Sequence, residues 1–149
     1  MTVTQHSSFY KFKYPKSSES NILMNNNQCV RVVGNNCIES VEAVDSTQTA
    51  YYYAIFSKPF KSYITWKDSL ISQDVKQEGL DIGALVTFNT SQDEEIIVKI
   101  GVSFIDMEQA KRNLEMEIPA WDFDKVKNDG REIWNNALGK IKIEGGTDK

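Results

Sequence analysis

The stretch Val98–Leu138, which reads VKIGVSFIDMEQAKRNLEMEIPAWDFDKVKNDGREIWNNAL, decides the fold of this chain. The segment around its start, Ile96–Phe104, is rich in β-branched residues, and such residues favour strands. The segment is close to continuously apolar, which is typical of a strand that is covered on both faces. We therefore predict a buried strand that runs directly into the helical part of the chain.

Two helices are predicted after this strand, over Asp106–Glu117 and Asp122–Leu138. Asp106 is a suitable N-cap with Gln109 three residues later, which is the spacing of a capping box. Pro119 ends the first helix, and Asp122 can cap the second. Gly139 is placed where a C-cap glycine is common. The stretch thus predicts a strand, a helix, a Pro-Trp corner and a second helix.

The remainder of the chain indicates short strands separated by turns. The predicted strands cover residues 9–14, 22–24, 29–33, 37–44, 49–56, 62–66, 84–89 and 95–104, with a further strand over 140–144. Residues 68–83 are polar and weakly patterned, and we predict a long loop there. Strands at short, regular spacing are typical of an antiparallel β-sandwich. The predicted fold class is therefore mainly β, an antiparallel sandwich followed by one or two C-terminal helices.

Composition limits the classes of function. A chain of 149 residues with 40% hydrophobic content is large enough for one domain with a real core. The net charge of −4 comes without a basic stripe, so a nucleic-acid partner is not expected. No run approaches the roughly 20 apolar residues that span a bilayer. The start, MTVTQHSSFYKFK, lacks the apolar core of a signal peptide.

The residues that could carry chemistry are few. His6 is the single histidine, and no orienting partner is visible in the sequence, so we interpret it as a solvated residue before the first strand. The acidic groups 93–95 and 122–124 are interpreted as solvating or capping residues rather than a catalytic pair. Cys29 and Cys37 flank a predicted hairpin turn, and both a disulfide and two free thiols stay open. One histidine and two cysteines do not make a zinc site.

Aromatic side chains are the best candidates for contact with a ligand. Tyr63 and Trp66 lie beside the predicted long loop, where a ring could stack on a sugar. An aromatic residue in a strand is more often part of a core, so these two are candidates for substrate binding only. No catalytic residue and no metal ligand is assigned from the sequence.

The central stretch also resembles glycoside hydrolase family 92, whose members are exo-acting α-mannosidases, many of them α-1,2-mannosidases. The matching positions are Val98–Ser103, Ala110, Asn113, Leu114, Glu117–Pro119 and Trp121–Phe123, followed by Trp134, Leu138, Ile141 and Ile143–Gly145. Phe56–Phe60 matches the F-S-K-P-F of the family. Phe12–Pro15 is similar to a family segment near the start, where Tyr10 replaces the usual histidine.

The resemblance implies the later part of an N-terminal β-sandwich of the galactose-mutarotase-like supersandwich type. Residues 1–104 would be the sandwich portion, and residues 105–149 a helical linker towards a catalytic (α/α)6 barrel. The general acid, the general base and the calcium ligands of the family belong to motifs absent from this sequence. The chain is then expected to be inactive alone, with no cofactor of its own, although calcium is implied for the parent enzyme.

The implied partners are the barrel and a mannose-containing glycan, with self-association as another expectation if a sheet edge is left open. Enzymes of the family are usually exported, to the periplasm, the cell surface or the medium. Two other functions stay open. One is a stand-alone sandwich that binds carbohydrate near Trp66, and the other is an interaction module that docks through its two helices.

Overall fold

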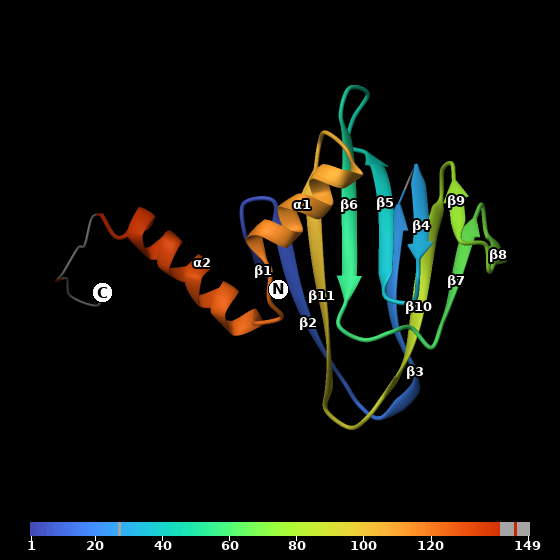
Figure 1. Cartoon of the computed structure of the whole chain (residues 1–149), viewed down its shortest axis with the longest axis horizontal. Coiled ribbons are helices and arrows are strands. Elements are labelled where there is room, and N and C mark those ends of the chain that lie inside the picture. The colour runs from blue at the N-terminus through green and yellow to red at the C-terminus, as the bar shows by residue number, and fades with distance from the viewer. Residues whose placement is uncertain (27, 141–144, 146–149) are drawn as a thin grey trace.

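The computed structural model describes residues 1–26, 28–140 and 145, and it forms two packed β-sheets followed by two helices (Figure 1). The strands are β1 (Thr2–Val3), β2 (Ser7–Tyr14), β3 (Ser17–Asn26), β4 (Cys29–Val33), β5 (Cys37–Ala43), β6 (Thr49–Phe56), β7 (Ser62–Lys67), β8 (Leu70–Ser72), β9 (Lys76–Glu78), β10 (Ile82–Thr90) and β11 (Glu94–Ser103). The helices are α1 (Met107–Glu117) and α2 (Phe123–Leu138).

Seven strands form one sheet in the order β1-β2-β11-β6-β5-β4-β9, and four form the other in the order β3-β10-β7-β8. All the recorded pairings are antiparallel. The predicted antiparallel sandwich with C-terminal helices is therefore confirmed. The core between the sheets consists of buried residues from five strands: Val30, Val32, Ile38, Ala54, Phe56, Ile82, Ala84, Val86, Phe88, Ile96 and Val98.

Strand β11 lies inside the larger sheet, between β2 and β6, and both of its faces are covered. Ile96 and Val98 point into the core between the sheets. The opposite face lies under α1, which crosses β11 and β6 (Figure 1). The nearly continuous apolar pattern of this segment correctly predicted a strand that is covered on both sides.

A glycine on β11 permits the close approach of α1. A Cβ atom at Gly101 would lie 2.0 Å from the carbonyl oxygen of Ala110 and 2.8 Å from the Cβ of Leu114. Ala110 and Leu114 are the buried residues of α1. Leu114 forms a second apolar cluster with Phe9 and Ile118 on the outer face of the larger sheet. The helix therefore packs backbone against strand, with no side chain between them at this point.

Both predicted N-caps are present. The side chain of Asp106 accepts a hydrogen bond from the backbone of Gln109 at 2.7 Å, and Asp122 accepts one from Lys125 at 2.9 Å. The side chain of Gln109 donates to Asn113 rather than back to residue 106, so only half of the expected capping box forms. Gly139 is the C-cap of α2, with φ −76°.

The long loop predicted over residues 68–83 is wrong, because this segment contains β8, β9 and the start of β10. The two added strands have only three residues each, too few for alternation to be visible in the sequence. Side-chain hydrogen bonds also hold these two strands in place. The amide of Gln77 donates to Thr65 at 3.2 Å and to Ser72 at 2.9 Å, which links β9 of the larger sheet to β7 and β8 of the smaller one.

Strand β3 is longer than the predicted 22–24, because its serine- and asparagine-rich ends pair with β10. The strand predicted over 140–144 falls mainly outside the described residues. Cys29 lies opposite Val41 and Cys37 opposite Val33, so the cysteines do not face each other and both are free thiols. Among the described residues, no helix is long and apolar enough to cross a membrane.

We expect the substitution Gly101→Ala to destabilise the chain by about 1–3 kcal/mol, because the added methyl group must displace the backbone of α1. Urea unfolding monitored by circular dichroism measures this change. Gly130→Ala is the matched control, since a Cβ there would only make ordinary contact at 3.7 Å from the Val3 carbonyl oxygen. Equal stability of the two variants would contradict the close packing described above.

Candidate functional site

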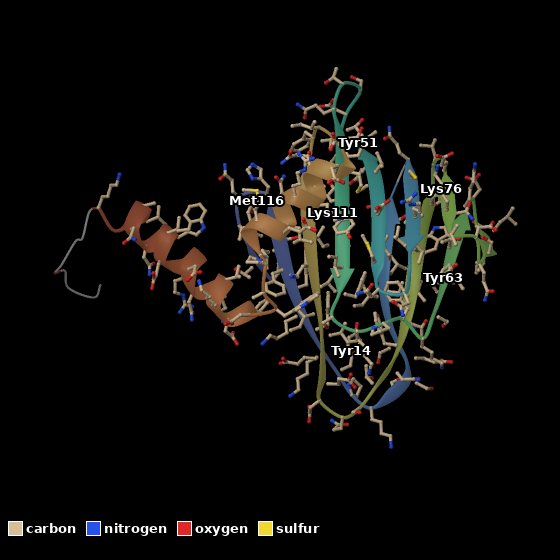
Figure 2. All side chains as sticks on the ribbon, in the orientation of Figure 1. Tyr14, Tyr51, Tyr63, Lys76, Lys111 and Met116 are labelled. Carbon is tan, nitrogen blue, oxygen red and sulfur yellow. The ribbon has the colours of Figure 1, made fainter. Side chains whose placement is uncertain are left out.

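The two aromatic candidates from the sequence do not form one site, because they lie on opposite faces of the smaller sheet. Tyr63 packs against the core between the sheets, and its hydroxyl donates to the carbonyl oxygen of Gln73 at 3.3 Å. Figure 2 shows it on β7, at the far side of the molecule from Met116 on α1. Trp66 points to the outer face, where its ring lies over Gly83 of β10.

Trp66 has mostly apolar neighbours, although Asn25 lies beyond Gly83 in the same row of the outer face. The register places Leu23, Leu85 and Ile64 side by side in the next row of the same outer face. Ile71 of β8 lies opposite Trp66 and is 70% exposed. This outer strip has an aromatic ring, as a sugar platform needs, but few hydrogen-bonding groups next to it.

The acidic side chains of the turn between β10 and β11 are paired with lysines. Asp93 contacts Lys13 at 3.0 Å, and Glu94 contacts Lys58 at 2.5 Å. The hydrogen bond from Lys58 and the one from the Ser91 backbone lower the pKa of Glu94 below its ordinary value. A low pKa keeps this carboxylate ionised, which fits a structural ion pair rather than a general acid.

The acidic side chains of residues 122–124 also have structural partners. Asp122 caps α2, and Asp124 and Glu95 both lie 3.5 Å from the ammonium group of Lys11. The interpretation of both groups as solvating or capping residues is compatible with these contacts, and the ion pairs are an additional role that the sequence did not show. Among the residues that the structure describes, no group of three or more His, Cys, Asp or Glu side chains could hold a metal ion. We therefore assign no calcium ligand to them.

His6 has a partner that the sequence did not reveal. Its Nδ1 lies 2.7 Å from Oε1 of Glu117, at the end of α1, and its backbone N–H donates to Oε2 at 2.9 Å. The hydroxyl of Thr4 donates to the same Oε2 atom. The solvated position expected for His6 agrees with its exposure, but the residue follows the short strand β1 rather than preceding the first strand. The β1–β2 loop is fastened to α1 through one carboxylate.

The environment of Glu117 affects its protonation. Partial burial alone would raise the pKa of this carboxyl group, but the hydrogen bonds from Thr4 and His6 outweigh that effect and lower it. The carboxylate therefore stays ionised at neutral pH and acts as an acceptor. A histidine beside an ionised carboxylate is an arrangement found in general bases, yet no nucleophile lies in contact with His6 among the described contacts.

Two apolar hollows flank the short strand β1. One, of about 650 Å³, lies between the β1–β2 loop, the end of β11 and α1, and it includes Phe104 and Ile105. The other, of about 430 Å³, lies between β1 and α2, and it includes Ile133 and Trp134. These four side chains are between 64% and 72% exposed. This end of the molecule, which we call the β1 end, thus carries a large exposed apolar surface.

The Pro-Trp corner between the helices rests on the outer face of β2 and β11. The ammonium group of Lys99 donates to the carbonyl oxygen of Ile118 at 2.9 Å and lies 4.3 Å from the ring centroid of Trp121. Phe9 on the neighbouring strand contacts Trp121 and Phe123, with centroids 6.3 Å and 5.5 Å apart. The sequence signal for the contact between Lys99 and the corner was a lysine inside a nearly continuous apolar run. No comparable sequence signal indicated the contact between His6 and Glu117.

Comparison with known families accounts for most of the chain. Residues 1–103 match the glycosyl hydrolase family 92 N-terminal domain, and residues 109–149 match the catalytic domain of the same family. A curated relative from Arthroderma benhamiae, described as an uncharacterized secreted glycosidase, is 37% identical over 68 residues, which are 43% of this chain and 9% of the relative.

Solved structures share the fold. A family GH92 inverting mannosidase from Bacteroides thetaiotaomicron superimposes with a TM-score of 0.88 over 97% of this chain and 21% of its own, at 21% identity. A family GH92 α-mannosidase from the same organism gives 0.85 over 97% and 22%, at 20% identity. The chain thus spans about a fifth of the length of these structures.

We expect Glu117→Gln to lower the stability of the chain by about 1–3 kcal/mol at neutral pH, since it weakens hydrogen bonds to an ionised acceptor. Because the folded-state pKa of Glu117 lies below its ordinary value of 4.5, the unfolded chain binds the proton first as the pH falls. The contribution is therefore full above pH 4.5 and is lost as the pH drops through the folded-state pKa.

The measurement is the free energy of unfolding in urea at pH 7 and at several values below 4.5, with wild type and variant side by side. Their difference should shrink in acid. Glu108→Gln is the control, because that exposed carboxylate only pairs with Arg112 at 3.6 Å on the same helix. A difference that stays constant with pH would show that Glu117 does not act through its charge.

Proposed function

Because the chain belongs to glycosyl hydrolase family 92, we propose that it is the sandwich and the first catalytic-domain helices of an exo-acting α-1,2-mannosidase. In this proposal the described residues do not perform the hydrolysis. They build the platform on which the rest of the catalytic domain sits, and they help to shape the pocket for terminal α-mannosides of glycans. The chain spans about a fifth of the solved relatives, which supports the proposal that the catalytic groups lie in the remainder.

The observation that carries this proposal is the position of α1. Most of its sequence, residues 109–117, falls in the match to the catalytic domain, yet its backbone packs directly on β11 at Gly101. By contrast, α2 buries none of its residues and leads away from both sheets (Figure 1). The chain therefore has the features of a junction, with one helix fixed to the sandwich and the next extended towards further structure.

The β1 end is the surface that we assign to the rest of the catalytic domain. Its exposed side chains come from both the sandwich and α2, so a partner that covers it would contact both at once. Covering apolar area of this kind stabilises association by about 25 cal/mol per Å² removed from water. The calcium that the family resemblance implies would be bound, in this proposal, by that same remainder.

The relative described as a secreted glycosidase supports an extracellular place of action. One solved relative, a family GH92 α-mannosidase, was determined in complex with mannoimidazole. Together with the inverting mannosidase from Bacteroides thetaiotaomicron, it supports terminal mannose as the substrate class of the parent enzyme. The linkage preference and the calcium dependence belong to the proposal.

We expect the 149-residue chain to release no mannose from α-1,2-mannobiose, whether calcium or EDTA is present. The inverting mannosidase from Bacteroides thetaiotaomicron serves as the positive control in the same assay. Calcium-dependent turnover by the chain alone would contradict the proposal. The carboxylates of residues 93–95, Asp122 and Asp124 would then have to be replaced one at a time to find the acid and the base.

We also expect the isolated chain to bind the dye ANS and to associate with itself as its concentration rises, because the β1 end is uncovered. The double substitution Ile133→Glu and Trp134→Glu, both in the hollow between β1 and α2, should remove much of the dye signal and of the larger species. Leu70→Glu with Ile71→Glu is the matched control at the opposite end of the sandwich, and it should change both much less. Light scattering after gel filtration measures the association.

A second candidate function is carbohydrate binding at Trp66, and the observation in its favour is the outward position of this ring over Gly83. Titration with methyl α-mannoside while tryptophan emission is recorded tests it, with Trp66→Ala as the variant. A saturable change that Trp66→Ala abolishes would support a binding module. No change at millimolar ligand would leave the platform role as the better explanation.

A further inference from the structure

Lys99 is a buried cation in a place where a salt bridge would be expected. Only 6% of the residue is exposed, yet none of the ion pairs among the described residues involves it. Burial lowers the pKa of its ammonium group. Because burying a charge is costly unless it is compensated, the contacts that Lys99 does make must replace both water and a counterion.

The first of these contacts is with the end of α1. Ile118 is the C-cap of that helix, and its carbonyl oxygen receives the hydrogen bond from Lys99 at 2.9 Å. The carbonyl end of a helix carries partial negative charge, and a cation there is stabilising. Helix α1 has no basic residue in its own last turn, so Lys99 supplies that cation from β11.

The second contact is with the beginning of α2. The ammonium group faces the ring of Trp121 at 4.3 Å, within the range of a cation–π interaction. Trp121 directly precedes Asp122, the N-cap of α2. One ammonium group therefore holds both the last carbonyl of α1 and the residue before the first turn of α2, on either side of Pro119.

Contacts of two kinds fix the direction of α2. Its first turn meets β2, where Phe123 lies 5.5 Å from Phe9 between ring centroids and Asp124 lies 3.5 Å from the ammonium group of Lys11. Beyond that turn the helix buries no residue and lies against β1. The corner that Lys99 holds directly precedes the first turn, so it contributes to the angle between α2 and the sandwich.

We propose that Lys99 is a positioning residue that sets the direction in which α2 leaves the sandwich. Its ammonium group locks the Pro-Trp corner, while its aliphatic stem is part of the packing on the outer face of β11. If the proposed function is also correct, this contact determines where the rest of the catalytic domain lies relative to the sandwich. The positioning role itself is a property of the described chain and does not require that domain.

The test measures the distance between the sandwich and α2 directly. Ser62 on β7 and Asn136 on α2 are exposed, and both are replaced by cysteine for spin labelling in a background of Cys29→Ser and Cys37→Ala. Double electron–electron resonance then gives the distribution of label distances. In this background, Lys99→Met removes the ammonium group and keeps an apolar stem of similar length. Lys13→Met removes an exposed lysine of β2 that pairs only with Asp93.

We expect Lys99→Met to broaden the distance distribution or shift its mean, while the thermal midpoint of the sandwich stays close to that of the parent. Lys13→Met should change neither. An unchanged distribution in folded Lys99→Met would overturn the proposal. So would a loss of sandwich stability with α2 still in place, since Lys99 would then be an ordinary core residue.

A second variant covers the case in which Lys99→Met does not fold. Trp121 is 41% exposed, so Trp121→Ala removes the other half of the contact with less disturbance of the core. It should broaden the distribution in the same way, and a distribution identical to that of the parent would overturn the proposal. None of these measurements uses a substrate, so their outcome is independent of whether the parent enzyme is a mannosidase.

Discussion

The absence of a side chain at Gly101 is the constraint on which the rest of the structure depends. Because no Cβ separates the strand from the helix, the backbone of α1 reaches van der Waals contact with β11. Leu114 and Ile118 can then close over Phe9 and cover the outer face of the sheet. The end of α1 comes to lie above Lys99, and the Pro-Trp corner follows from that position. A larger residue at position 101 would move every one of these contacts.

The molecule has two apolar layers with different tasks. The layer between the sheets is closed, and its large side chains are fully buried. The layer under α1 is closed only as far as the corner, and beyond it Ile133 and Trp134 stay exposed. The two layers share β11, which contributes one face to each. Because both layers pack on β11, the sandwich holds α1 in a fixed position. This arrangement suits a platform for a second domain.

The sequence allowed most of the larger sheet and both helices to be predicted. The alternation of aromatic residues with lysines over residues 9–14 and the β-branched run around Val98 are strong local signals, and Asp106 and Asp122 mark the helix starts. The edge strands β8 and β9 were not predictable, because three residues are too few to show an alternating pattern and because their position depends on contacts with distant residues, such as the one between Gln77 and Thr65.

Of the candidate site, Tyr63 and Trp66 were identified as aromatic strand residues, but alternation alone could not show which face a sugar would reach. The link between His6 and Glu117 joins residues far apart in the chain, and no local pattern announces such a pair.

The order of strands in the larger sheet has a consequence for the synthesis of the chain. The first long strand, β2, has the last one, β11, as its central partner. On a ribosome that delivers the N-terminus first, β2 therefore has only the two-residue β1 as a partner until nearly the whole sandwich has been translated. During that interval its alternate aromatic residues, Tyr10 among them, are open to chaperones and to other nascent chains. Closure of the sheet is thus a late, non-local event, and the speed of translation through β10 and β11 sets how long the unpaired strand is at risk.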